Sequence, residues 1–348
     1  MRSVRSKGKE KLTSFHKPML ATLGDQPFND PEWIFEIKWD GYRAIAQVGS
    51  SEVQLYSRNG LSFKPLYPSL AEALTKLKID AVLDGEIVVF NEDNKPDFQQ
   101  LQQFGDVQKG KLMYYVFDCL YVKGKSIMDK PLLERKEILK RLLPENEMIR
   151  YADHVEENGL DVFQRVKGMD LEGMIAKRSS SKYKIGTRTS DWLKIKNHNT
   201  QEAIIAGYTE PRGSRKFFGA LVLAIQQGSE LVYIGHTGTG FSDQTLREVF
   251  EKLQPLVRKK SPFSKKVPVK ANVTWVAPKL VCNIKYSEIT QGGILRHPVF
   301  LGLRIDKNAR ETNQLDQPIS TKRVIEKSHR KPVKKTSLKP KTTLKTES

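Results

Sequence analysis

Apolar and polar positions alternate with a period of two along much of the first half of the chain. This alternation predicts β-strands at residues 34–48, 53–60, 81–90, 112–122, 172–178 and 192–196. Apolar residues three or four positions apart predict helices at residues 67–77, 132–143 and 159–170. The proline-containing stretch 17–33 is expected to form loops and turns. Because the strands do not alternate regularly with long helices, the pattern favours an α+β domain with antiparallel sheets over a doubly wound parallel sheet.

The pattern changes after residue 199, where the chain becomes rich in strands. Strands are predicted at residues 202–210, 219–227, 230–240, 273–289 and 293–306, and one helix at residues 242–257. Five short strands and one helix in roughly 110 residues suit a small Greek-key barrel of the oligonucleotide-binding (OB) fold. We therefore expect a first domain at residues 16–199 and an OB-fold β-barrel domain at residues 200–315, joined by a polar hinge at residues 197–200.

The distribution of charge indicates a class of binding partner and two basic terminal segments. Lys and Arg number 59 against 40 Asp and Glu, and the formal net charge of +19 favours a polyanionic partner such as nucleic acid. Residues 1–15 are expected to be a basic flexible N-terminus and residues 316–348 a basic disordered tail. The tail is either a nonspecific DNA-binding arm or a solubilising extension. It holds only part of the excess charge, so the body of the chain is basic as well.

Cysteine content and hydropathy exclude several classes of protein. Two cysteines, Cys119 and Cys282, argue against a disulfide framework and a cysteine-ligated zinc site, and they fit a reducing cytosol. The basic N-terminus is not followed by an apolar segment, so no secretory signal is predicted. No apolar run reaches the about 18 residues needed to cross a bilayer, so we expect no membrane association.

The segment FEIKWDGYRA, Phe35 to Ala44, places charged residues inside an apolar strand-like run. Buried charges are costly without partners. The segment is therefore either an exposed strand face, with Lys38 paired to Glu36 or Asp40, or a site built around Lys38. Deprotonating a lysine at neutral pH costs about 4.6 kcal/mol from its reference pKa, and desolvation or neighbouring cations lower that cost. The segment alone leaves both interpretations open.

Further motifs follow in a fixed order: SRNG at 57–60, LDGEIVVF at 83–90, YYVFDCLY at 114–121, EGMIAKR at 172–178, WLKIK at 192–196 and LGLRIDK at 301–307. Together with Lys-x-Asp-Gly-x-Arg at Lys38, they resemble the ordered motifs of the covalent nucleotidyltransferases, which are ATP-dependent DNA and RNA ligases and messenger-RNA capping enzymes. EIKWDGYRAIA, TSDWLKIK and FLGLRIDK are most similar to the ligase domain of bacterial end-joining ligase D. The resemblance covers roughly residues 16–310 and implies an adenylation (nucleotidyltransferase) domain followed by the OB-fold domain.

The resemblance implies roles for the residues around the nucleotide phosphates. Lys38 would attack the α-phosphate of ATP and become adenylated. Lys194 and Lys196 alternate along a strand, so both ammonium groups point the same way, toward the phosphate. Asp40 would shape the site near the 3′-hydroxyl or a metal. Arg43, like Arg58 and Arg188, would hold ribose or phosphate oxygens with its planar guanidinium.

The other implied roles concern the nucleoside, the metal and the pyrophosphate. Glu86 would contact the ribose, and Glu86 and Glu172 are the candidate ligands for Mg²⁺ or Mn²⁺. Phe117 would stack on the purine, and Glu36 lies where the family's backbone reads the adenine edge. Arg304, Asp306 and Lys307 would orient pyrophosphate from the OB-fold domain. In isolation, Glu86 and Glu172 would also fit a structural ion pair with Lys177 or Arg178, and Phe117 would fit a core position. Arg304, Asp306 and Lys307 would fit a surface salt-bridge cluster.

The leading hypothesis from the sequence is an ATP-dependent DNA ligase that seals nicks and breaks through lysyl-AMP and DNA-adenylate intermediates. The alternatives are an RNA ligase or capping guanylyltransferase, and a DNA-end-binding scaffold with an inactive ligase fold. The expected partner is nicked or broken double-stranded DNA, and the end-joining resemblance adds a Ku-type end-binding protein. We expect a monomer in the bacterial cytosol or nucleoid.

Overall fold

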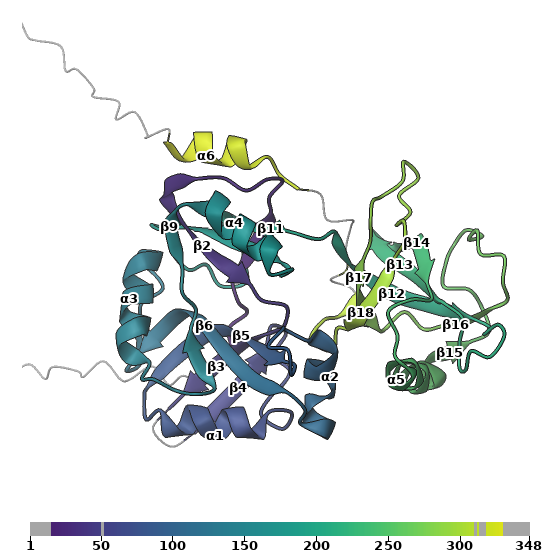
Figure 1. Cartoon of the computed structure of the whole chain (residues 1–348), viewed down its shortest axis with the longest axis horizontal. Helices are drawn as coiled ribbons and strands as arrows, with labels where there is room; N and C mark the ends of the chain where they lie inside the picture. Colours follow the sequence, from purple (N-terminus) through teal and green to yellow (C-terminus); the bar gives the residue numbers. More distant parts are fainter. Residues whose placement is uncertain (1–14, 50–51, 310–311, 313–317, 330–348) are drawn as a thin grey trace, which may run out of the picture.

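Three β-sheets organise the part of the chain that the structure describes (Figure 1). The structure is a computed structural model, and it describes residues 15–49, 52–309, 312 and 318–329. Two sheets are built from residues before 197, and the third is built from residues 200–303. The predicted N-terminal extension at residues 1–15 lies outside the described residues except for Phe15, and so does the predicted tail beyond residue 329.

The first sheet brings together strands that are distant in sequence. Its order is β1-β11-β10-β2-β9. The strands are β1 (Leu20–Leu23), β11 (Arg188–Lys196), β10 (Gly173–Arg178), β2 (Asp30–Lys38) and β9 (Val155–Glu157). Its pairings are antiparallel except that β1 runs parallel to β11. One face packs against helix α4 (Gly159–Gly168) around Trp33, Phe35 and Met174.

The second sheet has the order β4-β3-β5-β6-β7, with β8 added beside β6. Its strands are β4 (Val53–Ser57), β3 (Tyr42–Val48), β5 (Ala81–Phe90), β6 (Lys111–Val122), β7 (Lys125–Ser126) and β8 (Ile149–Tyr151). Helices α1 (Pro68–Lys76) and α2 (Phe98–Val107) share its largest apolar cluster, and α3 (Leu132–Leu142) packs on β6. A smaller cluster that includes Ile34, Ile45 and Trp192 joins the first two sheets, so they form one body.

The third sheet curls into a barrel. Its seven strands among the described residues follow the order β14-β13-β12-β16-β15, with β17 beside β12 and β18 beside β17. The strands are β12 (Thr200–Thr209), β13 (Leu221–Gln227), β14 (Glu230–Thr237), β15 (Val257–Arg258), β16 (Val273–Val276), β17 (Val281–Lys285) and β18 (Val299–Leu303). A bridge between Thr239 and Val299 closes the sheet, and α5 (Asp243–Leu253), followed by the 3₁₀ turn Gln254–Leu256, contributes Leu246 and Val249 to the barrel interior. The fold class predicted from the sequence, an antiparallel α+β domain followed by an OB-type barrel, is confirmed.

Two local features of the first domain differ from what the sequence pattern indicated. The stretch 17–33, expected to be loops and turns, contains β1 and the start of β2. Local pattern could not reveal β1, because its partner β11 lies far along the chain and Leu20 pairs with Arg188. Helix α2 was not predicted either; the side chain of Asp97 caps its N-terminus by accepting a hydrogen bond from the backbone N–H of Gln100.

The prediction of disorder from residue 316 onward is wrong for the stretch that forms α6 (Thr321–His329). Ile319, Val324 and Ile325 pack against the apolar cluster under the first sheet. Asp25 accepts hydrogen bonds from the backbone N–H and the hydroxyl of Thr321, at 2.9 and 2.8 Å, and so caps the helix. Figure 1 shows α6 lying above β2 and α4, away from the barrel. None of the helices in the described ranges is long and apolar enough to cross a lipid bilayer.

Candidate active site

The three central strands of the first sheet place charged side chains on one face and apolar side chains on the other. Strand register puts Lys38 opposite Gly173 and Gly173 opposite Lys196. The next pair of positions on the same face holds Glu36 and Lys194, because side chains two residues apart in a strand share a face. The intervening residues point into the apolar cluster. The alternation seen in the sequence therefore directs one set of side chains into the apolar core and the other set toward the candidate site.

Gly41 lets the turn after Lys38 pass against the second sheet. A β-carbon at this position would lie 2.2 Å from the backbone oxygen of Ile87 and 3.1 Å from the side chain of Glu86. Only a glycine fits such a close approach. The Asp-Gly pair of the motif thus brings Lys38 next to the strand that carries Glu86.

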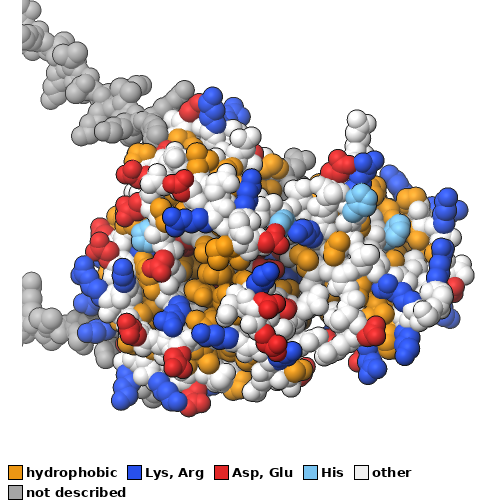
Figure 2. Space-filling view, in the orientation of Figure 1, with side chains coloured by type: hydrophobic (Ala, Val, Ile, Leu, Met, Phe, Trp, Pro, Cys, Tyr) orange, Lys and Arg blue, Asp and Glu red, His pale blue; other side chains and the backbone are white. Residues whose placement is uncertain are grey.

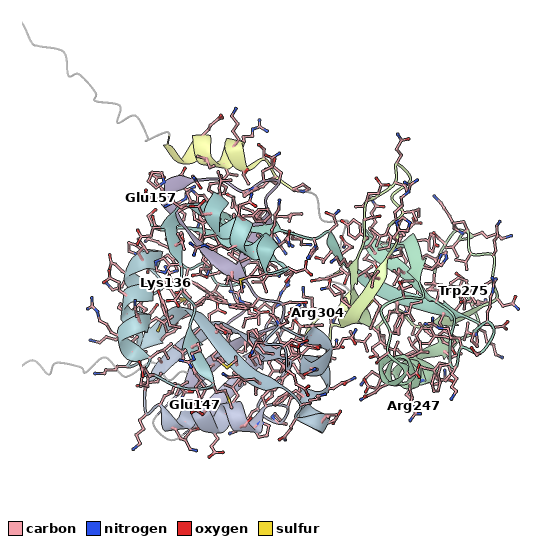
Figure 3. All side chains as sticks on the ribbon, in the orientation of Figure 1. Lys136, Glu147, Glu157, Arg247, Trp275 and Arg304 are labelled. Carbon is pink, nitrogen blue, oxygen red and sulfur yellow. The ribbon has the colours of Figure 1, made fainter. Side chains whose placement is uncertain are left out.

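A cavity of about 260 Å³ lies where the two sheets and the barrel meet. Its lining includes every site residue predicted from the sequence: Glu36, Lys38, Asp40, Arg43, Arg58, Glu86, Phe117, Glu172, Arg188, Lys194, Lys196, Arg304 and Lys307, with Asp306. Figure 3 shows Arg304 at the point where the barrel meets the first domain. The structure thus gathers residues from along the whole chain into one space, while their individual roles stay predictions.

Lys38 forms an ion pair with Glu172 inside this cavity. Burial favours the neutral amine, but the charges of Glu172, Asp40 and Glu86 outweigh it and raise the pKa of Lys38 above its usual value. Neighbouring cations, which the sequence analysis offered as one way to lower this pKa, do not dominate, because carboxylates surround the amine. In this arrangement Lys38 is protonated, and it must lose that proton before it can attack.

The carboxylates near Lys38 are themselves perturbed. Burial, reinforced by the charge of Glu172, raises the pKa of Asp40 to about 7. Burial raises the pKa of Glu86 to about 8, although Lys38 and Arg304 oppose the shift. For both carboxyl groups, burial therefore disfavours the ionised form more strongly than the neighbouring cations favour it.

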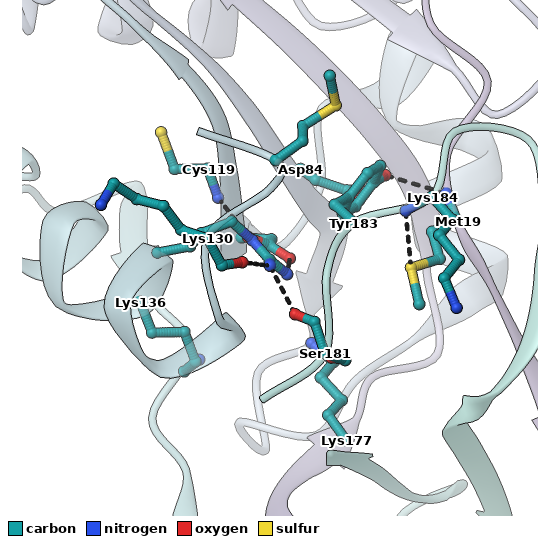
Figure 4. Close-up of polar contacts among 12 residues, drawn as sticks. Met19, Asp84, Cys119, Lys130, Lys136, Lys177, Ser181, Tyr183 and Lys184 are labelled. Atoms are coloured by element: carbon teal, nitrogen blue, oxygen red, sulfur yellow. Dashed lines mark hydrogen bonds and ion pairs between the residues drawn. The ribbon is translucent and has the colours of Figure 1, made fainter. Parts of the chain in front are cut away.

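Arg43 lines the cavity, but one edge of its guanidinium is already engaged. Its Nε and Nη2 donate to Asp84 at 2.9 and 2.6 Å, and the hydroxyl of Tyr183 donates to Asp84 at 2.6 Å. Figure 4 shows Tyr183 beside Asp84, with its hydroxyl also bonded to the backbone N–H of Met19. The sequence analysis did not single out Asp84, although a buried aspartate in the LDGE strand was a local signal for it.

The barrel contributes a second set of charges. Arg304 donates to both carboxylate oxygens of Asp306 at 2.8 Å, and Lys307 pairs with Glu202. Asn59 donates to the backbone oxygen of Asp306 at 2.8 Å, which ties the barrel to the first domain. Burial lowers the pKa of Lys307 to about 8, although Glu202 opposes the shift. Sequence analysis missed Glu202 because nothing in the local strand pattern pairs it with Lys307.

The remaining predicted residues lie at the edges of the cavity. Arg188 is exposed at the rim, where it donates to the backbone oxygen of Ala21. Phe117 presents its ring to the cavity, with the ammonium of Lys177 4.1 Å and the guanidinium carbon of Arg43 5.2 Å from the ring centre. Asp118, the next residue, points away from the cavity and pairs with Arg135.

No cluster of three or more acidic, histidine or cysteine side chains suited to a metal ion occurs among the described residues. Glu86 and Glu172 both line the cavity with Lys38. Mg²⁺ is commonly held by one or two carboxylates and completed by substrate phosphates and water, so two glutamates are sufficient protein ligands.

Two protein-family models match the chain. The model described as "ATP dependent DNA ligase domain" matches residues 18–196, and the model described as "ATP dependent DNA ligase C terminal region" matches residues 214–307. The two matches fall on the two-sheet body and on the barrel, respectively.

Curated relatives and solved structures agree with these matches. The multifunctional non-homologous end joining protein LigD of Pseudomonas aeruginosa is 39% identical over 319 residues, covering 89% of this chain and 38% of that protein. This chain thus spans about two fifths of that relative's length. The SPbeta prophage-derived DNA ligase-like protein LigB of Bacillus subtilis is 31% identical over 293 residues, covering 84% of this chain and 100% of that protein. A solved structure described as mycobacterial DNA ligase D complexed with ATP and MES has a TM-score of 0.65 and 34% identity, covering 85% of this chain and 97% of that one.

Proposed function

The chain belongs to the ATP-dependent DNA ligase family, and on that premise we propose that it seals strand breaks in double-stranded DNA through a covalent Lys38–AMP intermediate. The observation that carries the proposal is the position of Lys38. It lies in a cavity that receives cationic side chains from the first domain and, through Arg304 and Lys307, from the barrel. Such an arrangement suits transfer of a nucleotidyl group, in which charge on phosphate oxygens must be neutralised.

The proposed reaction has three steps. The deprotonated amine of Lys38 attacks the α-phosphate of ATP; a nitrogen–phosphorus bond forms and pyrophosphate leaves. An oxygen of the 5′-phosphate at the break then attacks the phosphorus of AMP and releases Lys38. Finally the 3′-hydroxyl attacks the 5′-phosphate, the phosphodiester bond forms and AMP leaves.

The proposed roles follow the geometry of the cavity. Lys194 and Lys196 share a sheet face with Lys38, which supports a role at the phosphate. Arg304 and Lys307, held by Asp306 and Glu202, would orient the pyrophosphate in the first step. The remaining assignments are those from the sequence, with Phe117 and Glu36 at the base and Arg58 and Arg188 at the ribose or phosphates.

Glu86 and Glu172 would hold a divalent cation, Mg²⁺ or Mn²⁺. The pKa of Glu86, raised by burial to about 8, supports this, because a nearby divalent cation would supply the charge that keeps the carboxylate ionised. When bound, the cation would neutralise phosphate charge and so favour attack at phosphorus.

The wider setting is proposed from the relatives. LigD of Pseudomonas aeruginosa is named for non-homologous end joining, which supports a role in repairing breaks. A monomer in the bacterial cytosol or nucleoid, acting on nicked or broken DNA with a Ku-type end-binding partner, is the arrangement that we propose.

The deciding experiment is covalent labelling. The protein is incubated with Mg²⁺ and α-labelled ATP or GTP beside Lys38→Ala and the matched surface control Lys76→Ala. Label from ATP on the native protein and the control, but not on Lys38→Ala, is the expected result, followed by sealing of a nicked DNA duplex. Label from GTP instead would indicate a capping guanylyltransferase, and sealing of RNA alone an RNA ligase. If neither nucleotide labels the protein, and mass measurement excludes prior adenylation, the chain is an inactive DNA-binding scaffold.

A further inference from the structure

Glu36 is buried between two lysines that come from different elements. Its Oε1 accepts a hydrogen bond from Lys136 of α3 at 2.5 Å, and its Oε2 accepts one from Lys177 of β10 at 2.6 Å. The three side chains are 4%, 1% and 2% exposed, respectively. Three charges out of water are expensive to bury, and apolar side chains of similar volume are often as stable or more so. Core packing alone does not account for the cluster.

The position of Glu36 relates it to the reacting lysine. Glu36 and Lys38 lie on the same face of β2, and a strand rise of about 3.3 Å per residue puts their Cα atoms about 7 Å apart. Glu36, Lys177 and Phe117 all line the cavity, and the ammonium of Lys177 lies 4.1 Å from the ring centre of Phe117. A purine stacked on that ring would bring its hydrogen-bonding edge toward the carboxylate.

Lys136 lies behind Glu36, outside the residues that line the cavity. Its ammonium also donates to the backbone oxygen of Ala152 at 3.0 Å and lies 4.6 Å from the ring centre of Tyr151. Figure 4 shows Lys136 on its helix and Lys177 on a separate segment. Because its direction is set by these contacts, Lys136 can hold one carboxylate oxygen of Glu36 in place.

We propose that Lys136 is a positioning residue for base selection: it fixes the carboxylate of Glu36 so that Glu36 accepts a hydrogen bond from the exocyclic amino group of adenine. The proposal rests on the proposed function. Adenine presents an amino donor on this edge, whereas guanine presents a carbonyl oxygen. An ionised carboxylate only accepts hydrogen bonds, and with about four lone-pair sites it retains capacity beyond its two lysine partners. It would therefore attract adenine and repel guanine, favouring ATP over GTP.

The charge state of Glu36 agrees with this role. Burial opposes its ionisation, but Lys136 and Lys177 together hold the pKa of Glu36 below its usual value. Without Lys136, one carboxylate oxygen loses its ammonium partner, and the side chain is free to turn toward Lys177.

The test compares Lys136→Met with Lys140→Met. Lys140 lies one turn further along α3, is exposed, and also has its ammonium near Tyr151, at 5.8 Å. Lysyl-adenylate formation is measured in single turnover against ATP and GTP concentration. Lys136→Met is expected to raise the ATP concentration that gives the half-maximal rate about tenfold, while its maximal rate stays within about threefold of that of the native protein. The ratio of ATP to GTP affinity should fall about tenfold. Lys140→Met should change each quantity less than about twofold.

Three further experiments test the proposal whatever the result of the first. In the Lys38→Ala background, the affinities for ATP and GTP are measured by calorimetry, which tests the role of Lys136 even if the chain forms no adenylate. A failure of this proposal can therefore be distinguished from a failure of the proposed function. If Lys136→Met does not fold, Lys136→Arg and Lys136→Gln replace it; arginine should retain the preference and glutamine should weaken it. Adding Lys136→Met to Glu36→Gln should cost nothing more in nucleotide affinity. A fall in maximal rate alone, with ATP affinity and base preference unchanged, would overturn the proposal and make Lys136 a structural residue.

Discussion

Two ion pairs in the first domain have similar chemistry and different surroundings. Arg135 donates to both oxygens of Asp118 at 2.8 Å, and its remaining nitrogen donates to the backbone oxygens of Lys130 and Ser181. Both side chains are 0% exposed. Lys38 and Glu172 are 21% and 11% exposed and open into the cavity.

The difference in surroundings suggests different roles: the first pair stabilises the fold, and the second pair is available to a bound ligand. Arg135 and Asp118 hold each other and the backbone, so removing either partner leaves a buried charge without compensation. Lys38 and Glu172 are held by each other in a cavity lined by further charges. A phosphate could therefore replace Glu172 beside Lys38, and a cation could replace Lys38 beside Glu172. The same distinction should appear when each pair is broken.

The largest effect is expected from Arg135→Met, as a loss of stability. Asp118 would remain buried without its cation, which we expect to lower the free energy of unfolding by about 3–5 kcal/mol. Denaturant unfolding checks this, with Arg141→Met on the exposed side of the same helix as the control. A change no larger than that of the control would mean that the pair is not a structural element.

Next in size is Glu172→Gln, as a loss of rate with little loss of stability. We expect single-turnover adenylation to slow about 100-fold, equal to about 2.7 kcal/mol in the barrier, because the proposed divalent cation that neutralises phosphate charge would lose one of its two carboxylate ligands. The exposed carboxylate variant Glu156→Gln is the control. If Glu172→Gln instead unfolds the protein while the folded fraction reacts normally, the two pairs are alike and the distinction fails.

A smaller and more selective effect is expected from Lys307→Met in the barrel. Adenylation should slow about tenfold, because one cation leaves the side of the cavity where we propose that pyrophosphate is held. Sealing of a DNA nick that already carries AMP should be retained, since that step involves no pyrophosphate. Equal losses in both reactions would place Lys307 outside the first step.

The smallest effect is a shift in pH dependence. Burial lowers the pKa of Lys307 to about 8, so its ammonium is present below that pH and is lost above it. The kcat/KM for ATP should therefore decline above pH 8, since this parameter reports groups of the free enzyme. Lys307→Arg stays charged and should move the decline to higher pH. An unchanged profile would assign the decline to another group.

The positions of the lysine and arginine side chains could be predicted from the sequence only in part. Figure 2 shows lysine and arginine side chains spread over both domains, with many along the outer edge of the barrel. Net charge predicted a polyanionic partner for the whole molecule. It could not distinguish exposed lysines from Lys136 and Lys177, which are fully buried and serve a carboxylate.

The sequence by itself determined which face of each strand carries charge. The period of two placed Glu36 with Lys38 on one side of their strand, and Lys194 with Lys196 on one side of theirs, because alternation is a local property of an extended chain. The order of motifs indicated the family, and the change in pattern after residue 199 indicated a barrel.

Only the tertiary structure decided which charged groups meet. The partners Glu36 and Lys136 are 100 residues apart, and Lys307 and Glu202 are 105 apart. Their contacts depend on how α3 packs and how the barrel docks, as the pairing of β1 with β11 depends on sheet order. Local patterns carry no record of such distant partners, because burial and ion pairing are set by the three-dimensional arrangement of the elements.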